Sequence, residues 1–462
     1  MVFSSISFIF FILPLALLLD ASARAMKSVN WRNVLLLSVS LLFYIWGEAA
    51  NVFLLIALGI FNYYAGWKLK QKQNNRSFLI VAVAINLGVL FYYKYAAWLV
   101  TLIVPAISFN QHAMPLGISF FTFHALSYLI DIYRRQIEPA QNARDFLTYF
   151  CMFPHLVAGP IVRYAHISGE LTQRGPDWAL FNFGVYRFLI GLNKKVIIAN
   201  SVAILADTAF TNSASSGLSS VDAWIGILAY SVQIYFDFSG YSDMAIGLAA
   251  MLGFRFAENF KRPYSSASIK EFWRRWHISL STWFRDYLYI SLGGSRAGEW
   301  VTYRNLLIVF FLCGLWHGAN MTFVIWGLWH GFFLVFERLK PIDALIQKMP
   351  FFVMRIYTLI AVVIGWVFFR ASSLSEALVY LKQMFSFSGG ITLDYFGVGI
   401  IMLFVGIAIS LTPDRFIPQP TSDKTGVEAF SFSGYLFQII LAVLSLTILL
   451  TSTRNPFIYF NF

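Results

Sequence analysis

The sequence predicts an all-α polytopic membrane protein with about eleven or twelve transmembrane helices and further re-entrant or interfacial helices. Two observations lead to this fold class. Apolar residues make up 58% of the 462-residue chain and charged residues only 12%, whereas a soluble globular domain carries roughly 25% charged residues. The apolar residues are also gathered into runs long enough to cross a bilayer. This composition excludes a disordered chain, a disulfide-stapled secreted scaffold and a nucleic-acid-binding module.

The first apolar run extends from Val2 to Leu19, and we interpret it as an uncleaved helix. The segment 21–23 resembles a signal-peptidase site, but no Lys or Arg precedes the run and Asp20 interrupts the approach to the site. The further predicted spans are 33–47, 52–67, 78–92, 95–109, 115–132, 178–204 (with room for a bend), 222–253 and 304–337 (each long enough to hold a break), 354–369, 397–412 and 434–452. No internal repeat or soluble region separates them, so we expect a single membrane domain over residues 1–462.

Basic residues predict the orientation of the chain. The first loop contains Arg24, Lys27 and Arg32, the second loop at 47–51 contains none, and residues 68–76 contain four. Cytoplasmic loops are enriched in Lys and Arg, so we expect the N-terminus outside the cytoplasm. Basic residues in cytoplasmic loops and beside lipid headgroups also explain the net charge of +12. A specific anionic substrate is the alternative explanation.

Two segments do not fit an ordinary span. Segment 153–164 contains Pro154, Gly159 and Pro160, which break a helix and free backbone polar groups. Irregular backbone is tolerated at membrane depth only where protein or a water-filled cavity covers it. Segment 261–285 is too charged to span a bilayer and too aromatic for a free loop. We therefore expect this second segment to form interfacial or re-entrant helix.

His317 is the first catalytic candidate, because it lies in an apolar run and Gly314 and Gly318 flank the pair Trp316-His317. Glycine permits close approach of another backbone or a ligand. A neutral imidazole in a dry pocket can take a proton from a hydroxyl, which suits acyl transfer. A hydrogen-bonded packing histidine explains the same pattern, and the sequence alone leaves both readings open, although histidine within a membrane segment is rare.

Two neighbours of His317 have weaker claims. Cys313 is four residues earlier and would share its helical face, but nothing else supports a Cys–His relay, so we interpret it as a small buried apolar residue. His330 follows thirteen residues later, roughly 140° around a continuous helix. We therefore expect His330 to be a packing residue.

A second candidate cluster surrounds His277. This residue either orients the acyl donor or the acceptor hydroxyl, or is an interfacial histidine in an aromatic belt. Arg274 and Arg285 are eleven residues apart and would lie about 20° apart on a continuous helix. Together with Arg275 they form a candidate binding set for the phosphates of a nucleotide-like donor. Lipid headgroups explain these arginines equally well.

The remaining polar residues of the apolar runs are expected to make internal contacts. Asp237 and Asp243 are six residues apart, about 240° around a helix, so they do not form a dyad and we expect each to pair with arginine. His124 and His155 are given the same interpretation. The two cysteines form no disulfide framework and no zinc motif, so no metal is expected.

Several motifs, in this order, resemble the membrane-bound O-acyltransferase (MBOAT) family. They are Pro154-His155 with Gly159-Pro160, the run Phe236-Asp237-Phe238-Ser239-Gly240-Tyr241-Ser242-Asp243, Trp276-His277-Ile278-Ser279, and Leu315-Trp316-His317-Gly318. The resemblance covers nearly the whole chain, up to the segment 455–460. It is strongest to the alginate O-acetyltransferase membrane subunits of the bacterial polysaccharide branch, and the D-alanyl-lipoteichoic-acid transfer proteins are more distant.

This resemblance implies a ring of tilted helices, thinned at its centre, with a funnel from each face joining at the histidine. It implies that His317 matches the family's invariant histidine, and that His277 matches a position filled by His, Asn or Asp. It further implies acetyl-CoA as the cytoplasmic donor, a polysaccharide hydroxyl as the extracytoplasmic acceptor, a periplasmic SGNH-hydrolase-like partner and a bacterial inner-membrane location.

The expected function is transfer of acetyl groups from acetyl-CoA across the inner membrane for O-acetylation of an alginate-type polysaccharide, with His317 as general base or transient acetyl carrier. Cellulose and peptidoglycan are alternative polymers. A lipid-linked sugar transporter is an alternative from another class, but it predicts matching halves with broken helices, which the sequence lacks. A scaffold with structural histidines is the third hypothesis, and it predicts that His317→Ala leaves acetylation intact.

Overall fold

The computed structural model confirms the all-α prediction. It describes residues 2–71, 75–104, 113–175, 177–215, 218–391, 397–412, 421–422, 428–429, 431–451 and 457–458. Across these residues the regular structure is helical except for one antiparallel pair of two-residue strands, β1 (Thr421–Ser422) and β2 (Glu428–Ala429). The end of the predicted span 95–109 and most of segment 455–460 lie outside the described residues.

Membrane-spanning length is reached by seven helices in the described part of the chain, which confirms a multi-pass membrane protein. They are Phe8–Ala25, Val29–Glu48, Val52–Gln71, Arg76–Lys94, Trp178–Ala214, Phe351–Arg370 and Phe432–Thr451, and the shorter apolar helices are Ile118–Tyr133, Met321–Phe336 and Val398–Leu411. Of the two segments long enough to hold a break, 304–337 is broken into two helices, whereas 222–253 contains one continuous helix of 32 residues.

Contacts divide the chain into two compact units, each built from separate stretches of sequence. Unit 1 comprises Met1–Leu192, Tyr241–Glu258 and Pro420–Val443, and unit 2 comprises Asn193–Gly240, Asn259–Gln419 and Leu444–Phe462. The expected single membrane domain stays a prediction.

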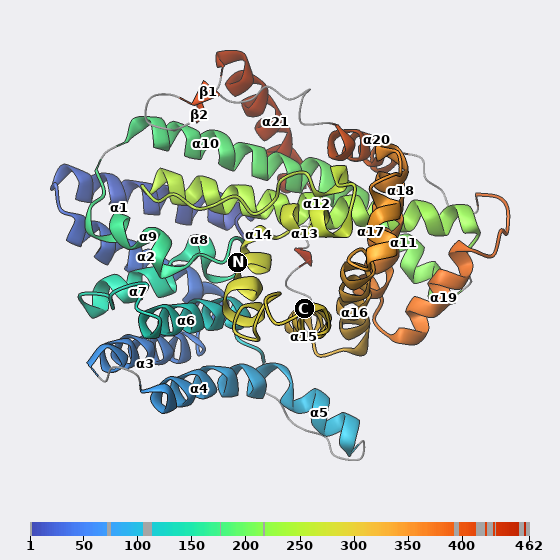
Figure 1. The fold of residues 1–462 in the computed structure, drawn as a ribbon. Helices are drawn as coiled ribbons and strands as arrows, with labels where there is room; N and C mark the ends of the chain where they lie inside the picture. Colours follow the sequence, from blue (N-terminus) through green and yellow to red (C-terminus); the bar gives the residue numbers. More distant parts are fainter. Residues whose placement is uncertain are drawn as a thin grey trace. The chain divides into compact units, whose positions relative to one another are not determined.

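Unit 1 contains the N-terminal helices, labelled in Figure 1. Its helices are η1 (Phe8–Ile12), α1 (Leu13–Ala25), α2 (Val29–Glu48), α3 (Val52–Gln71), α4 (Arg76–Lys94), α5 (Ala96–Ile103), α6 (Ile118–Tyr133), α7 (Ala143–Cys151), α8 (Phe153–Leu156), α9 (Tyr164–Thr172) and nearly all of α10 (Trp178–Asn193). It also contains the C-terminal end of α12 (Ser220–Met251) and the start of α21 (Phe432–Thr451). Helix α6 is the most buried of the short apolar helices and packs against α3 and α4.

The proline-rich segment behaves as the sequence predicts. After the four-residue helix α8, residues 157–163 are irregular, and nearly all of this stretch is buried by protein. Gly159 has a left-handed φ of 105°. The imidazole Nε2 of His155 donates a hydrogen bond to the carbonyl of Tyr149 at 2.7 Å, and the ring of His124 packs against that of His155 in a tilted arrangement with centroids 4.5 Å apart. These two histidines therefore make internal contacts within unit 1.

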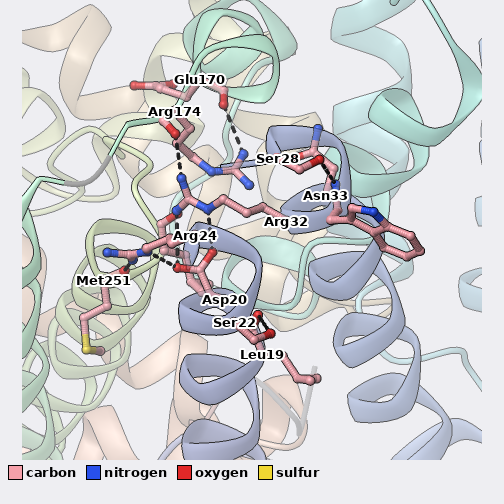
Figure 2. Close-up of polar contacts among 12 residues, drawn as sticks. Leu19, Asp20, Ser22, Arg24, Ser28, Arg32, Asn33, Glu170, Arg174 and Met251 are labelled. Atoms are coloured by element: carbon pink, nitrogen blue, oxygen red, sulfur yellow. Dashed lines mark hydrogen bonds and ion pairs between the residues drawn. The ribbon is translucent and has the colours of Figure 1, made fainter. Parts of the chain in front are cut away.

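A buried ion cluster joins α1, α2 and the end of α12 (Figure 2). Asp20 is 6% exposed and accepts hydrogen bonds from Arg24 at 2.6 Å and Arg32 at 2.8 Å. The same arginines donate to the carbonyls of Met251 and Leu252, which close the C-terminal end of α12. Arg24 and Arg32 were expected in the first loop. They instead lie inside α1 and α2, where their charges hold backbone carbonyls that the end of a helix leaves unpaired.

A third arginine adds positive charge to this cluster. Arg174 lies between α9 and α10, its carbonyl accepts from Arg32 at 2.7 Å, and its guanidinium stacks 4.2 Å from the centroid of the Phe254 ring. Burial, followed by repulsion from Arg32, lowers the pKa of Arg174 to about 9. The carboxylate of Asp20 therefore stabilises a cluster in which arginines outnumber carboxylates.

The carboxylates of α12 are paired separately, as the sequence predicts, although not both with arginine. Asp243 contacts Arg187 at 2.7 Å, and Arg187 also contacts Glu258 at 2.6 Å. Asp237 contacts Lys195 at 2.6 Å, with both side chains almost fully buried. The partner of Asp237 is a lysine rather than the expected arginine, because η2 (Lys194–Ala199) contributes Lys195.

Unit 2 contains the candidate catalytic residues. Its helices are η2 (Lys194–Ala199), α11 (Asn200–Ser215), the first two thirds of α12, η3 (Pro263–Ser265), α13 (Ile269–Arg275), α14 (Ile278–Trp283), η4 (Phe284–Tyr289), α15 (Glu299–His317), α16 (Met321–Phe336), α17 (Lys340–Ile346), α18 (Phe351–Arg370), α19 (Leu374–Met384), α20 (Val398–Leu411) and the end of α21. The segment 261–285 forms short, largely buried helices instead of a span, in agreement with its charge and aromatic content.

The N-terminus of helix α13 is held by a local cap and by a carboxylate from another helix. Ser268 caps it by accepting the backbone N–H of Glu271 at 3.0 Å. The carboxylate of Glu337, at the end of α16, accepts the N–H groups of Ile269 and Lys270 at 2.6 and 3.1 Å. A carboxylate at a helix N-terminus satisfies unpaired donors and complements the helix dipole. These bonds tie α13, and the His277 loop after it, to α16.

Candidate functional site

His317 is placed at a helix end by its sequence neighbours. Helix α15 ends at His317, Gly318 is extended, and Asn320 caps α16 by accepting the N–H of Thr322 at 3.1 Å. The imidazole is 4% exposed. Three aromatic rings stand edge-on to it, Trp316 and Trp326 with centroids at 4.9 Å and Phe369 at 5.1 Å. A base in such an enclosure is shielded from water, which suits chemistry on a hydrolysable acyl group.

The two copies of the pentapeptide Gly-Leu-Trp-His-Gly, at 314–318 and 327–331, pack their helices together through the first glycine of each. A Cβ added to Gly314 would lie 2.3 Å from the carbonyl oxygen of Phe323, and one on Gly327 would lie 2.2 Å from that of Phe310. The close backbone approach expected from the glycines beside His317 is confirmed. It holds the C-terminal part of α15, which ends at His317, against α16.

Gly327→Ala is therefore expected to destabilise the protein by about 1–3 kcal/mol, the usual cost of overpacking, and to lower activity by displacing the end of α15. The measurement is the thermal unfolding midpoint of the purified protein. Gly331→Ala is the matched control, because its Cβ would meet only side-chain and Cα atoms at 3.1 Å or more. Equal midpoints for the two variants would contradict the prediction.

His277 is held in a strained loop between α13 and α14. It has φ 43° and ψ 55°, a left-handed conformation that costs a non-glycine residue roughly 1–3 kcal/mol. The ring is fully buried, and burial lowers its pKa to about 3, so the imidazole is neutral at physiological pH. Its ring centroid lies 4.7 Å from that of Phe238 and 6.2 Å from that of Trp316.

The two candidate histidines share one aromatic cluster in unit 2. The indole of Trp316 contacts both imidazoles, because it is next to His317 in sequence and faces His277 in space. His330 also joins this cluster, with its ring 5.2 Å from that of Trp326. Neither ring nitrogen of His330 has a hydrogen-bond partner among the described residues, and its surroundings are aromatic. His330 thus has the environment of a packing residue.

A basic cavity of about 390 Å³ is lined by residues of α13, α14, η4, α15 and α16. Its polar lining includes Lys270, Arg274, Ser281, Thr282, Arg285 and Arg338. Cys313, one helical turn before His317, lines the same cavity, together with apolar residues of α15. Arg274 and Arg285 therefore share one cavity, but not for the reason predicted, because the left-handed His277 interrupts the continuous helix on which their spacing was measured. Arg275 does not line the cavity and instead contacts Glu271 at 2.8 Å.

A second, more polar cavity of about 340 Å³ lies next to the His317 enclosure. Phe369, which stands edge-on to His317, lines it together with Asn320 and Phe323. The hydroxyl of Tyr230 and the amide oxygen of Gln233 are buried in its wall without hydrogen-bond partners in the described part of the chain. Buried polar atoms are ordinarily paired, so this wall suits a ligand with hydroxyl groups.

Residues that the sequence analysis did not single out complete the site. Asn259 contacts the imidazole of His277 at 3.2 Å, Trp326 and Phe369 stand edge-on to His317, and Tyr230 and Gln233 line the second cavity. They come from four separate segments, and only their folding brings them together. Cys151 and Cys313 are both buried free thiols. Within the described residues no group of three or more His, Cys, Asp or Glu side chains is placed to hold a metal ion.

The model of the MBOAT, membrane-bound O-acyltransferase family matches residues 140–375, which include His277, His317 and all residues that line the first cavity. The chain belongs to this family.

The MBOAT chain is also 39% identical to the probable alginate O-acetylase AlgI of Pseudomonas putida, over the whole of both chains. It is 36% identical to the peptidoglycan O-acetyltransferase of Helicobacter pylori, covering 84% of this chain and 80% of that protein. The teichoic acid D-alanyltransferase of Bacillus subtilis is more distant, at 29% identity over 45% of this chain and 55% of that protein. The protein is thus a multi-pass MBOAT acyltransferase.

Proposed function

We propose that this membrane-bound O-acyltransferase transfers acetyl groups from cytoplasmic acetyl-CoA to hydroxyls of an extracytoplasmic polysaccharide. The observation that carries the proposal is the basic cavity whose lining includes Cys313, one helical turn before His317. Its cations suit the phosphates of a nucleotide-like donor, and its apolar inner wall suits the uncharged thioester end. The similarity to AlgI proteins supports an alginate-type polymer, and the similarity to the Helicobacter pylori protein supports peptidoglycan as the alternative.

In the proposed reaction, His317 takes the proton of the acceptor hydroxyl. The hydroxyl oxygen forms a bond to the thioester carbonyl carbon, the C–S bond breaks, and the leaving CoA thiolate receives the proton from the imidazolium. In the covalent version, a ring nitrogen of His317 first forms the bond to the acetyl carbon while the C–S bond breaks, and the leaving CoA thiolate takes up the N–H proton of the ring. The acceptor oxygen then bonds to the acetyl carbon and displaces the ring, which takes up the proton of the hydroxyl. In both versions the aromatic enclosure excludes water that would hydrolyse the thioester.

The polar cavity beside Phe369 supports the acceptor half of the proposal. Tyr230 and Gln233 offer hydrogen-bonding atoms that the described part of the protein leaves unused, and a sugar hydroxyl can donate to or accept from them. We place the protein in the bacterial inner membrane, with its N-terminus outside the cytoplasm and an SGNH-hydrolase-like periplasmic partner. Lys27 between α1 and α2, the four basic residues of segment 68–76 and the family resemblance support this arrangement.

The donor assignment is tested with the protein reconstituted in vesicles and radiolabelled acetyl-CoA. Arg274→Gln combined with Arg285→Gln is expected to raise KM for acetyl-CoA by about 10-fold or more, the worth of a hydrogen bond to a charged group. We expect kcat to change little, because both arginines contact a part of the donor that does not react.

Arg275→Gln is the matched comparison, since Arg275 is on the same helix as Arg274 but outside the cavity. If it raised KM as strongly as the double substitution, the arginines would act through general positive charge, and the cavity would not be the donor site. An unchanged KM in the double variant would also reject this site.

A further inference from the structure

The loop that carries His277 is clamped by one side chain, Asn259, which is fully buried. Its amide oxygen Oδ1 accepts the backbone N–H of Ser279 at 3.2 Å and the hydroxyl of Ser279 at 2.8 Å, and it lies 3.2 Å from Nδ1 of His277. The backbone carbonyl of Asn259 also accepts the N–H of Ile278 at 2.9 Å. A single residue therefore holds both the backbone and the imidazole at this left-handed position.

These contacts decide which ring nitrogen of His277 carries the proton. The backbone N–H of Ser279 can only donate, so the amide atom that faces it is the oxygen. That same oxygen faces Nδ1 of His277, and an amide oxygen can only accept. The hydroxyl of Ser279 is 3.5 Å from Nδ1, but its single proton is used in the shorter bond to Asn259. Nδ1 is therefore the protonated nitrogen, and Nε2 carries the lone pair.

We propose that Asn259 is a positioning residue that fixes His277 as its Nδ1-protonated tautomer and thereby presents Nε2 as a hydrogen-bond acceptor to the substrate. In this arrangement His277 binds an O–H or N–H of the substrate while His317 carries out the proton or acetyl transfer. The division of labour between the histidines rests on the proposed function, whereas the tautomer rests only on the geometry of the loop.

The strained backbone of His277 is an independent indication that this loop has a function. A left-handed non-glycine residue persists only where its surroundings over-determine it, and such residues cluster at functional sites. Here three hydrogen bonds from residues 278–279 to Asn259 provide that support. These three hydrogen bonds would hold the loop in this shape whichever side chain occupied position 277. The contact between Asn259 and Nδ1 requires an imidazole there.

The direct test is ¹⁵N NMR of the reconstituted protein labelled with ¹⁵N-histidine, with the His277 signals identified by their loss in His277→Gln. Wild type is expected to carry the proton on Nδ1. Asn259→Asp, which keeps an acceptor oxygen, is expected to preserve this tautomer, and Asn259→Leu, which removes it, is expected to lose the preference. Ser279→Ala is the matched control, because it removes another donor to the same oxygen and should leave the tautomer unchanged. A wild-type ring protonated on Nε2 would overturn the proposal.

Acetyl transfer gives the second readout. Asn259→Leu is expected to lower kcat/KM by about 10–100-fold, as is usual when the residue that orients a functional histidine is lost, and Asn259→Asp is expected to restore most of it. A folded Asn259→Leu protein with wild-type kcat/KM would reject the positioning role. If wild type transferred no acetyl group while its NMR showed the Nδ1 tautomer, the proposed function would fail and the tautomer assignment would stand.

Discussion

Replacing His317 by glutamine is expected to lower the rate of acetyl transfer by about 10²–10⁴-fold, the usual contribution of a positioned general base. Glutamine keeps a polar side chain of similar size inside the enclosure of Trp316, Trp326 and Phe369, but it has no basic nitrogen. The measurement is release of CoA and appearance of labelled acetyl groups on the far side of vesicles that contain the purified protein.

His330→Gln is the matched control, because His330 occupies the same place in the second Gly-Leu-Trp-His-Gly segment and is equally buried. It is expected to retain transfer at a cost in stability. A folded His317→Gln protein that matched wild type would make His317 a packing residue and reject the mechanism. If neither wild type nor control turned over until a periplasmic protein was added, the proposed partner would be required for turnover.

The same pair of variants separates the two versions of the chemistry. With labelled acetyl-CoA and no acceptor, a transient acetyl carrier is expected to leave label on the protein in wild type and in His330→Gln, but not in His317→Gln. A general base is expected to leave no label on any of the three.

Asp20→Asn is expected to lower the free energy of unfolding by about 3–5 kcal/mol, the usual effect of removing one partner of a buried ion pair. This is a larger loss than the one expected for Gly327→Ala. The substitution leaves Arg24 and Arg32 beside Arg174 without their carboxylate, in the cluster shown in Figure 2. The thermal unfolding midpoint and the yield of purified protein are the measurements.

Glu138→Gln is the control for this prediction. Glu138 contacts Lys70 in the same unit, but their side chains are 77% and 49% exposed, and an exposed pair contributes only about 0–1 kcal/mol. The prediction fails if Asp20→Asn unfolds at the same temperature as Glu138→Gln.

The sequence predicted the structure correctly where physical chemistry leaves a segment only one arrangement. Long apolar runs must be helical in lipid because every backbone group needs a partner, and this requirement predicted the helices of unit 1. Pro154, Gly159 and Pro160 predicted the irregular segment for the same reason. Glycines around His317 predicted close packing, since a side chain at Gly314 or Gly327 would collide with a carbonyl.

Helical geometry failed where it was extended across a break. The angular separations calculated for Arg274 and Arg285, and for His317 and His330, assumed continuous helices. The chain instead turns at His277 and again at Gly318. The residues are brought together by folding, so their separation on a helical wheel carried no information. Asn259 gave no signal at all, because an isolated asparagine in a loop has many ordinary uses, and only its distance from His277 reveals this one.

The left-handed backbone at His277 also restricts which side chains evolution can place there. Outside glycine, Asn, Asp and His are the residues enriched in positive φ, and these three are the set that the family resemblance gives for this position. The conformation of the main chain therefore limits which functional groups this position can carry. It admits short or flat polar side chains that can contact a substrate and disfavours branched and bulky ones. A substitution to glycine would relax the loop and remove the imidazole, so we expect a more stable protein with slower acetyl transfer.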